Sequence, residues 1–294
     1  MPVAQPAVVS TRLENVGSLN VRGFEASLDA QLFSGANSSM TSGLVFTMER
    51  NEIDALGLDR QFIITGSVNG QGQSGKFAQR LIPGQPIGTF WGAEFAGYNS
   101  DKQQLFNKYT VTRDAQGREL TRTRDGTTTS PGGDDEVIIG NANPAFSLGI
   151  RSNATWKKFD ASWLWRAEVS RDVFNNTSLV YSTTANVNQS RNFLRSALSN
   201  QDALGQPAIY SSRWIEDGSF LRLQNLTVGY QVRLPGLSSR DSRLYVSGDN
   251  LLLFTPYSGY DPEVFVDNGL AVRGIDYLIY PRARTFTAGV RVQF

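Results

Sequence analysis

The chain ends in Arg284-Thr-Phe-Thr-Ala-Gly-Val-Arg-Val-Gln-Phe294, where apolar and polar residues alternate. A period of two residues is typical of a β-strand with one apolar and one polar face. The stretch therefore predicts a strand that meets an apolar medium on one side and water on the other. Its apolar face would carry Phe286, Ala288, Val290, Val292 and Phe294.

The same alternation recurs along the chain in segments of roughly ten residues. Between Phe159 and Val169, for example, Trp163 and Trp165 share one face with small apolar residues, and Leu164 is the one exception on the polar face. We predict nine strands from these segments: 18–32, 38–50, 75–83, 86–98, 144–157, 158–170, 219–233, 242–255 and 284–294.

The connections between these strands alternate in length. Short ones fall at 33–37, 83–86, 157–158 and 235–242, and long ones at 51–74, 99–143, 171–218 and 256–283. Loops of that size are uncommon in compact soluble domains, whereas tight turns at one end and long loops at the other are typical of outer-membrane barrels. The prediction is an all-β fold, an antiparallel transmembrane β-barrel segment of about nine strands.

An odd number of strands does not close a standard bacterial barrel. We therefore expect residues 1–294 to be the C-terminal portion of a larger barrel. The N-terminus, Met1-Pro-Val-Ala-Gln-Pro-Ala7, has no signal-peptide pattern. Residues 1–17 are expected in an extracellular loop of that larger protein.

The composition narrows the function. The chain has no Cys and no His, which excludes disulfides, cysteine nucleophiles, His-based triads and structural zinc sites. A formal net charge of +1 without a Lys/Arg block argues against nucleic-acid binding. No window has the roughly 18 apolar residues of a membrane-spanning helix. No enzyme activity, cofactor or metal is predicted.

Two local motifs have plainer readings. Gly70-Gln-Gly-Gln-Ser-Gly-Lys-Phe77 resembles a P-loop, but Phe77 stands where a Ser/Thr hydroxyl should bind magnesium, so a Gly-rich loop is favoured. Asp134-Asp-Glu136 could supply paired carboxylates for glycoside hydrolysis, but adjacent acids in a polar loop are usually solvated. A surface glycosidase is therefore a minor alternative.

Several stretches resemble the C-terminal half of SusC/RagA-like TonB-linked outer-membrane receptors. The most specific is Tyr257-Ser-Gly-Tyr-Asp-Pro-Glu263, and the resemblance covers nearly the whole chain. Other matching stretches are Leu13-Glu-Asn-Val-Gly-Ser-Leu-Asn-Val-Arg-Gly-Phe-Glu25, Gly84-Gln-Pro-Ile-Gly-Thr-Phe-Trp-Gly92, Ile139-Gly-Asn-Ala-Asn-Pro-Ala-Phe-Ser-Leu-Gly149, Arg213-Trp-Ile-Glu-Asp-Gly-Ser-Phe-Leu-Arg-Leu-Gln-Asn-Leu-Thr-Val-Gly-Tyr230, and Gly274-Ile-Asp-Tyr277 with Tyr280-Pro-Arg-Ala-Arg-Thr-Phe286.

The resemblance implies a place in the bacterial outer membrane, in contact with lipid, as the last part of a 22-stranded barrel that imports glycan oligosaccharides or peptides. It also implies a SusD-like surface lipoprotein as lid and the TonB complex, reached through a plug domain missing here. The loop at 129–137 lacks the alternating oxygen ligands of a calcium loop seen in many relatives, so no calcium is expected.

The site residues follow from these expectations. Aromatic rings stack on sugars and peptides, and carboxylates accept their hydrogen bonds, so the predicted substrate-binding residues of the long loops are Trp214, Tyr257, Tyr260, Asp261 and Tyr277. The C-terminus looks like the signal read by the barrel-assembly machinery, with Gly289, Val290, Val292 and Phe294.

Aromatic girdles at the two membrane interfaces are predicted from residues on several strands. A soluble β-sandwich module that binds carbohydrate remains an alternative, because one apolar face also suits half a sandwich. The predicted girdle residues are Trp156, Phe159, Trp163, Trp165, Tyr230, Tyr245, Phe286 and Phe294.

Overall fold

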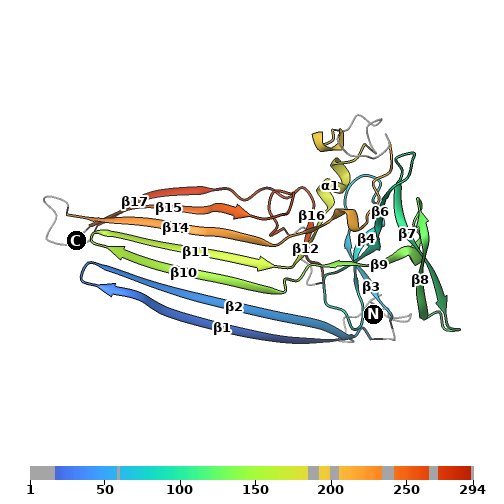
Figure 1. Cartoon of the computed structure of the whole chain (residues 1–294), viewed down its shortest axis with the longest axis horizontal. Helices are drawn as coiled ribbons and strands as arrows, with labels where there is room; N and C mark the ends of the chain where they lie inside the picture. The colour runs from blue at the N-terminus through green and yellow to red at the C-terminus, as the bar shows by residue number, and fades with distance from the viewer. Residues whose placement is uncertain are drawn as a thin grey trace, which may run out of the picture.

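A computed structural model describes residues 17–57, 60–184, 192–198, 205–233, 242–264 and 271–292. Its main feature is one long antiparallel sheet, which we call the wall sheet, with folded loops gathered at one end (Figure 1). The wall sheet runs in the order β1 (Ser18–Gly35), β2 (Ser38–Ala55), β10 (Phe146–Trp156), β11 (Phe159–Val169), β14 (Phe220–Val232), β15 (Ser242–Phe254) and β17 (Thr285–Arg291).

The wall sheet has seven strands, and the prediction that 75–83 and 86–98 also belong to it is wrong. These segments form β4 (Phe77–Leu81) and β5 (Thr89–Ala93) in a separate four-stranded sheet. Each has five residues, whereas a transmembrane strand needs about 9–11. The turn between them is bound to the far end of β2, where Gly84 N donates to Ile53 O at 2.8 Å. Alternation alone did not reveal this shortness.

The strands of the wall sheet are still joined by alternating short and long connections, but there are fewer connections than predicted. Tight turns join β1 to β2 and β10 to β11, the second at Lys157 and Lys158 as predicted. Three long connections, 56–145, 170–219 and 255–284, all leave the opposite end. Most of the 235–242 connection lies outside the described residues. We call the two ends of the wall sheet the turn end and the loop end.

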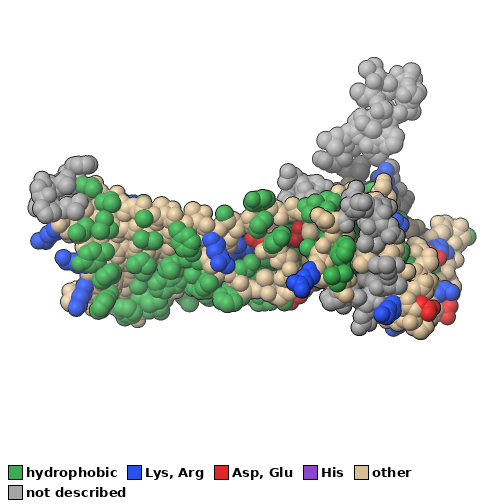
Figure 2. Space-filling model, turned by 90° about the horizontal axis from the view of Figure 1, so that it is seen from above, with side chains coloured by type: hydrophobic (Ala, Val, Ile, Leu, Met, Phe, Trp, Pro, Cys, Tyr) green, Lys and Arg blue, Asp and Glu red, His purple; other side chains and the backbone are tan. Residues whose placement is uncertain are grey.

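One face of the wall sheet is apolar and exposed. Cross-strand register aligns Ile150 with Leu44 on β2 and with Trp165 on β11, and the same face continues to the outer strands. Val290 lies on this face and is 58% exposed, whereas Arg291 points to the other, as the alternation predicts. Among the described residues no second sheet covers this face, so the sandwich alternative loses its structural basis. Figure 2 shows hydrophobic side chains gathered along the wall sheet.

Aromatic side chains form rows near both ends of the apolar face. Phe159 lies in the turn-end row, with its ring centroid 6.3 Å from that of Trp156 and 4.8 Å from that of Tyr230. At the loop end Phe46 stacks with Phe146 at 5.6 Å. Ten residues separate the two rows along β10, which at a strand tilt of about 40° spans roughly 25 Å, the height of an outer-membrane apolar band.

The remaining predicted girdle residues are distributed differently. Trp165 stacks with Phe254 towards the loop end at 6.5 Å, and Trp163 and Phe286 lie between the two rows. Tyr245 is on the polar face, where its ring covers Gly289, so its assignment to the girdle is wrong. Phe294 lies outside the described residues.

The polar face carries charges that pair across glycines. Gly229 of β14 lies between Asp160 of β11 and Arg243 of β15, and these two side chains form an ion pair over it. A Cβ at Gly229 would be 2.3 Å from Nε of Arg243. Glycine is therefore required here by the close approach of the pair, although its backbone conformation is ordinary.

We expect Gly229→Val to break the pair between Asp160 and Arg243 and to lower the free energy of unfolding by about 1–3 kcal/mol, because overpacking forces both side chains away. Gly149→Val, on the polar face of β10, is the control, since a Cβ there would meet no atom within 4 Å. Denaturant unfolding in lipid vesicles measures both variants. Equal losses would contradict the assigned role of Gly229.

The loops at the loop end fold into one body, which we call the loop unit. Its core contains Phe90, Phe174, Leu179, Trp214 and Ile275, drawn from all three long connections. It contains three small sheets and one short helix, α1 (Asn176–Tyr181). The first sheet consists of β3 (Ile63–Ser67), β4, β5 and β9 (Glu136–Asn141), and the second of β6 (Phe95–Tyr98), β7 (Gln104–Arg113) and β8 (Glu119–Thr128). The third consists of β13 (Ile215–Asp217), β12 (Asp172–Asn175) and β16 (Ile275–Asp276). No helix among the described residues is long and apolar enough to cross a membrane.

Candidate functional site

The motif Tyr257–Glu263 holds the last long loop against the wall sheet through a buried arginine. Arg222 of β14 is fully buried, and its Nη2 lies 2.6 Å from Oδ1 of Asp261. Its Nε lies 3.0 Å from Oε2 of Glu263, and it also donates to Asn250. Buried charges are tolerated where they are paired and hydrogen-bonded. The two acids of the motif therefore serve as anchors for the loop.

Two further arginines complete this cluster. Arg166 of β11 lies 3.2 Å from Oε1 of Glu263, and Arg282 lies 3.2 Å from its Oε2. Arg282 is 47% exposed, so its pairs are solvated and weak. The cluster therefore links β11, β14 and the segment before β17, and Arg222 is its buried centre.

The first half of the motif is fixed to the small sheet of β12, β13 and β16. The hydroxyl of Tyr257 donates to Oδ2 of Asp276 at 2.5 Å. Glu216 accepts from the backbone N and from Oγ of Ser258, both at 2.8 Å, and from Nδ2 of Asn175 at 2.9 Å. Side chains of the 170–219 connection, together with Asp276 from the same last loop, thus hold the motif in place.

Burial of Asp276 makes the stability of this small sheet depend on pH. Burial raises the pKa of Asp276 above its ordinary value, although hydrogen bonds from Tyr257 and Thr177 oppose the shift. Over the pH range between the ordinary and the raised pKa, the folded chain retains a proton that the unfolded chain releases. Stability therefore falls as the pH rises through that window, upward from about pH 4.

We expect Asp276→Asn to flatten this dependence, because the amide has no proton to lose. The free energy of unfolding, measured between about pH 3 and pH 7, tests this. Asp101→Asn, at an exposed turn in the loop unit, is the control and should leave the slope unchanged. An unchanged slope in Asp276→Asn would show that another group is responsible.

The structure separates the five predicted substrate-binding residues into two groups. Trp214 belongs to the core of the loop unit and its Nε1 donates to Ile209 O, and Tyr257 and Asp261 are buried in the contacts described above. Tyr260 is 74% exposed and Tyr277 is half-buried. The structure thus leaves Tyr260 as the most accessible of the five.

Sequence reasoning missed several residues of this site. Arg222, Glu216 and Asp276 lie in stretches that carry the family resemblance, but the sequence analysis assigns them no role, although they hold the motif in place. The signal available in the sequence is Arg222, a charged residue on a strand that is predicted to belong to the barrel wall. Tyr280, close in sequence to the predicted Tyr277, is 92% exposed.

A concave region lies in the loop unit beside the Gly-rich segment. It is a cavity of about 610 Å³ lined by Lys76, Phe77, Arg80 and Pro207–Tyr210, among others. The guanidinium of Arg80 is 4.4 Å from the ring centroids of both Phe62 and Trp91, and pairs with Glu136 at 2.7 Å. The P-loop-like segment thus lines a mixed polar and apolar cavity, and no helix follows it.

The acidic cluster has structural partners. Asp134 pairs with Arg113, and Glu136 pairs with Arg80 and accepts from Nε1 of Trp91 at 3.1 Å. Asp135 accepts from the backbone N of Tyr109 at 2.8 Å. The three carboxylates thus point to separate partners. In the described part of the chain, no group of three or more acidic side chains could hold a metal ion.

Of the predicted barrel-assembly residues, Gly289 and Val290 lie in β17 on opposite faces of the wall sheet, and Val292 follows the strand. Phe294 is outside the described residues. Their role in assembly stays a prediction.

Known proteins are similar to this chain along its whole length. TonB-dependent receptor P3 of Formosa agariphila is 30% identical over 312 residues, which is all of this chain and 30% of that receptor. TonB-dependent receptor SusC of Bacteroides thetaiotaomicron is 28% identical, over 96% of this chain and 27% of that receptor. The chain thus spans about 30% of the length of these relatives. No family model matches it.

The fold has a counterpart among solved structures. The RagAB peptide importer in its 'closed-closed' state matches 98% of this chain with a TM-score of 0.75 at 23% identity, and the match takes up 31% of that chain. At this identity the match bears on the fold, and the fold agrees with the relatives found by sequence. The chain is therefore a relative, along its whole length, of the SusC/RagA-like TonB-dependent receptors, and its wall sheet is a segment of their β-barrel.

Proposed function

We propose that this chain forms part of the wall and extracellular loops of a bacterial outer-membrane importer of nutrients, glycan oligosaccharides or peptides. One observation supports this most directly. The wall sheet has a continuous exposed apolar face, a charged opposite face and a large folded loop unit at one end, as expected where lipid, water and the cell exterior meet.

In this proposal residues 1–294 are the C-terminal portion of the barrel, and the rest of the wall and a plug domain come from elsewhere in the receptor. The plug would connect to the TonB complex, and a SusD-like lipoprotein would cover the loop unit. The names of the relatives, a TonB-dependent receptor and a peptide importer, support the dependence on TonB and the importer function.

The test is uptake by cells that express the whole receptor carrying this sequence. Labelled oligosaccharides and peptides should enter those cells, and uptake should stop when the proton-motive force is collapsed. The lipoprotein should co-purify with the receptor. Uptake that persists without the receptor, or a receptor that is soluble and folded without detergent, would refute the proposal.

The exposed tyrosines of the last long loop should contact the substrate. We expect Tyr260→Ala and Tyr280→Ala each to reduce uptake by about 2–10-fold, the effect of losing one stacking contact, without changing thermal stability because both rings are exposed. Leu120→Ala, 64% exposed on β8, is the control. Full uptake in both tyrosine variants would place the substrate elsewhere.

A further inference from the structure

A row of small side chains crosses the apolar face of the wall sheet near the turn end. On its turn-end side, cross-strand register places a row of Trp156, Phe159, Tyr230, Leu244 and Val290. On its loop-end side the next row is Ser152, Trp163, Leu226, Gly248 and Phe286, which includes three large side chains. The small row consists of Ala154, Ala161, Val228, Val246 and Ala288.

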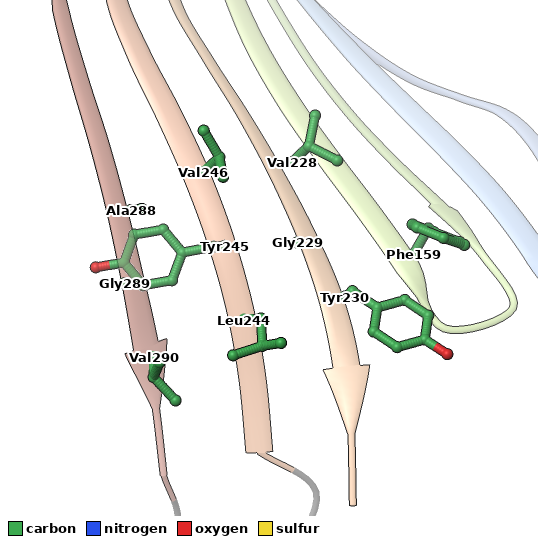
Figure 3. Close-up of a pocket in the computed structure, with 10 residues that line it drawn as sticks. All are labelled: Phe159, Val228, Gly229, Tyr230, Leu244, Tyr245, Val246, Ala288, Gly289 and Val290. Atoms are coloured by element: carbon green, nitrogen blue, oxygen red, sulfur yellow. The ribbon is translucent and has the colours of Figure 1, made fainter.

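The difference in side-chain size produces a shallow trough. A depression of about 450 Å³ lies over β11, β14, β15 and β17, with Val228, Val246 and Ala288 along it (Figure 3). Tyr230 and Leu244 bound it at the turn end, and Val246 is 57% exposed. Its side chains on this face are apolar, so a hydrocarbon chain would fill it without losing hydrogen bonds.

Basic residues lie at the turn end of the wall sheet. Among the described residues within four positions of the turn-end strand termini are five cations and one carboxylate, Asp160, which is already paired with Arg243. Arg243 and Arg291 lie on the polar face, so Lys157 and Lys158 are the cations that bear on the trough. The Nζ atom of Lys157 lies 5.3 Å from the ring centroid of Trp156, which belongs to the apolar face. Figure 2 shows Lys and Arg side chains at the turn end, beside the hydrophobic side chains of the wall sheet. The cations are Lys157, Lys158, Arg233, Arg243 and Arg291.

We propose that this trough and the lysine turn together bind one acidic phospholipid of the membrane leaflet at the turn end. An acyl chain lies along the small row, and the phosphate lies near Lys157 and Lys158. Lysine ammonium groups reach headgroups while their aliphatic stems stay beside apolar residues, and interfacial Trp and Tyr rings suit the same depth. The positive charge of Lys157 and Lys158 selects an acidic headgroup over a zwitterionic one. This inference rests on the proposed placement of the wall sheet in a membrane.

The test uses the whole receptor that carries this sequence, purified in detergent and titrated with phosphatidylglycerol or with phosphatidylcholine. Native mass spectrometry counts the lipids retained. We expect retention of phosphatidylglycerol at about tenfold lower concentration than phosphatidylcholine, and loss of that preference in the double variant Lys157→Asn/Lys158→Gln. Asn is chosen because Lys157 has φ +53°, which Asn tolerates.

A matched control is available in the loop unit. Lys102 has φ +60° and Lys108 is exposed, so Lys102→Asn/Lys108→Gln makes the same charge change away from the trough. This control should keep the lipid preference. Ala288→Trp, which fills the trough, should lower retention of both lipids and leave the lysines in place.

The outcomes separate the lipid site from the function. Equal retention of the two lipids by the unmodified receptor, or an unchanged preference in Lys157→Asn/Lys158→Gln, would overturn the lipid site while leaving a detergent-dependent importer intact. A receptor that is soluble without detergent would instead refute the proposed function, and the lipid site with it.

Discussion

Replacing Arg222 with alanine should cost about 3–5 kcal/mol of stability, because it leaves Asp261 and Glu263 as buried carboxylates without their central cation. Arg222 is fully buried and its partner Asp261 is 7% exposed, so water does not replace the lost pair. The last long loop should detach from the wall sheet. Urea unfolding in lipid vesicles measures the loss, and limited proteolysis within 255–284 reports the detachment.

Arg282→Ala is the matched control, because it removes a cation from the same two acids at a site that is 47% exposed. Exposed pairs contribute about 0–1 kcal/mol, so this variant should remain protease-resistant and close to the parent in stability. If both variants lost the same amount, the buried arginine would not be the anchor of the motif. If neither did, contacts with the 170–219 connection, such as those of Glu216, would be enough to hold the loop.

The wall sheet was largely predictable from the sequence because its chemistry repeats every two residues. Ile150 and Arg151 lie on opposite faces of the wall sheet, and the residues of β10 alternate between the apolar and the polar face in the same way. The tight turn at Lys157 and Lys158 follows from the same pattern. The register fixed by these turns then places Trp156, Phe159 and Tyr230 in one row, as sequence alternation indicates.

The loop unit was not predictable because its partners are distant in sequence and its strands are short. The local sequence of the five residues of β4 does not differ from that of the end of a membrane strand. The hydrogen bonds that hold β4 and its following turn in the loop unit are made with the backbone of Ile53 and Arg273, which are distant in sequence. Trp214 and Asp261 were predicted to bind substrate because aromatic and acidic residues do so in loops. The structure shows that Trp214 is part of the loop-unit core and that Asp261 pairs with Arg222, and their role in substrate binding stays a prediction.

Introducing arginine at Ile150 should impair the barrel more than at any position near its rim, and this tests the membrane placement itself. Ile150 lies on the apolar face, midway between the aromatic rows of β10, with Leu44 and Trp165 beside it. Arginine on a lipid-facing strand costs about 2–4 kcal/mol at the midplane and about 0–1 near the interfaces. Val290, in the turn-end row, should therefore tolerate arginine much better.

The control for this depth dependence is Asn153→Arg, three residues along the same strand on the polar face, where a cation meets water and not lipid. Folding free energies in vesicles should rank Ile150→Arg as the most costly, then Val290→Arg, with Asn153→Arg close to the parent. The ranking matters more than the absolute values, because only a lipid bilayer makes the cost depend on depth as well as on face. Equal costs at Ile150 and Val290 would mean that the apolar face meets another protein surface, and the proposed importer would lose its membrane.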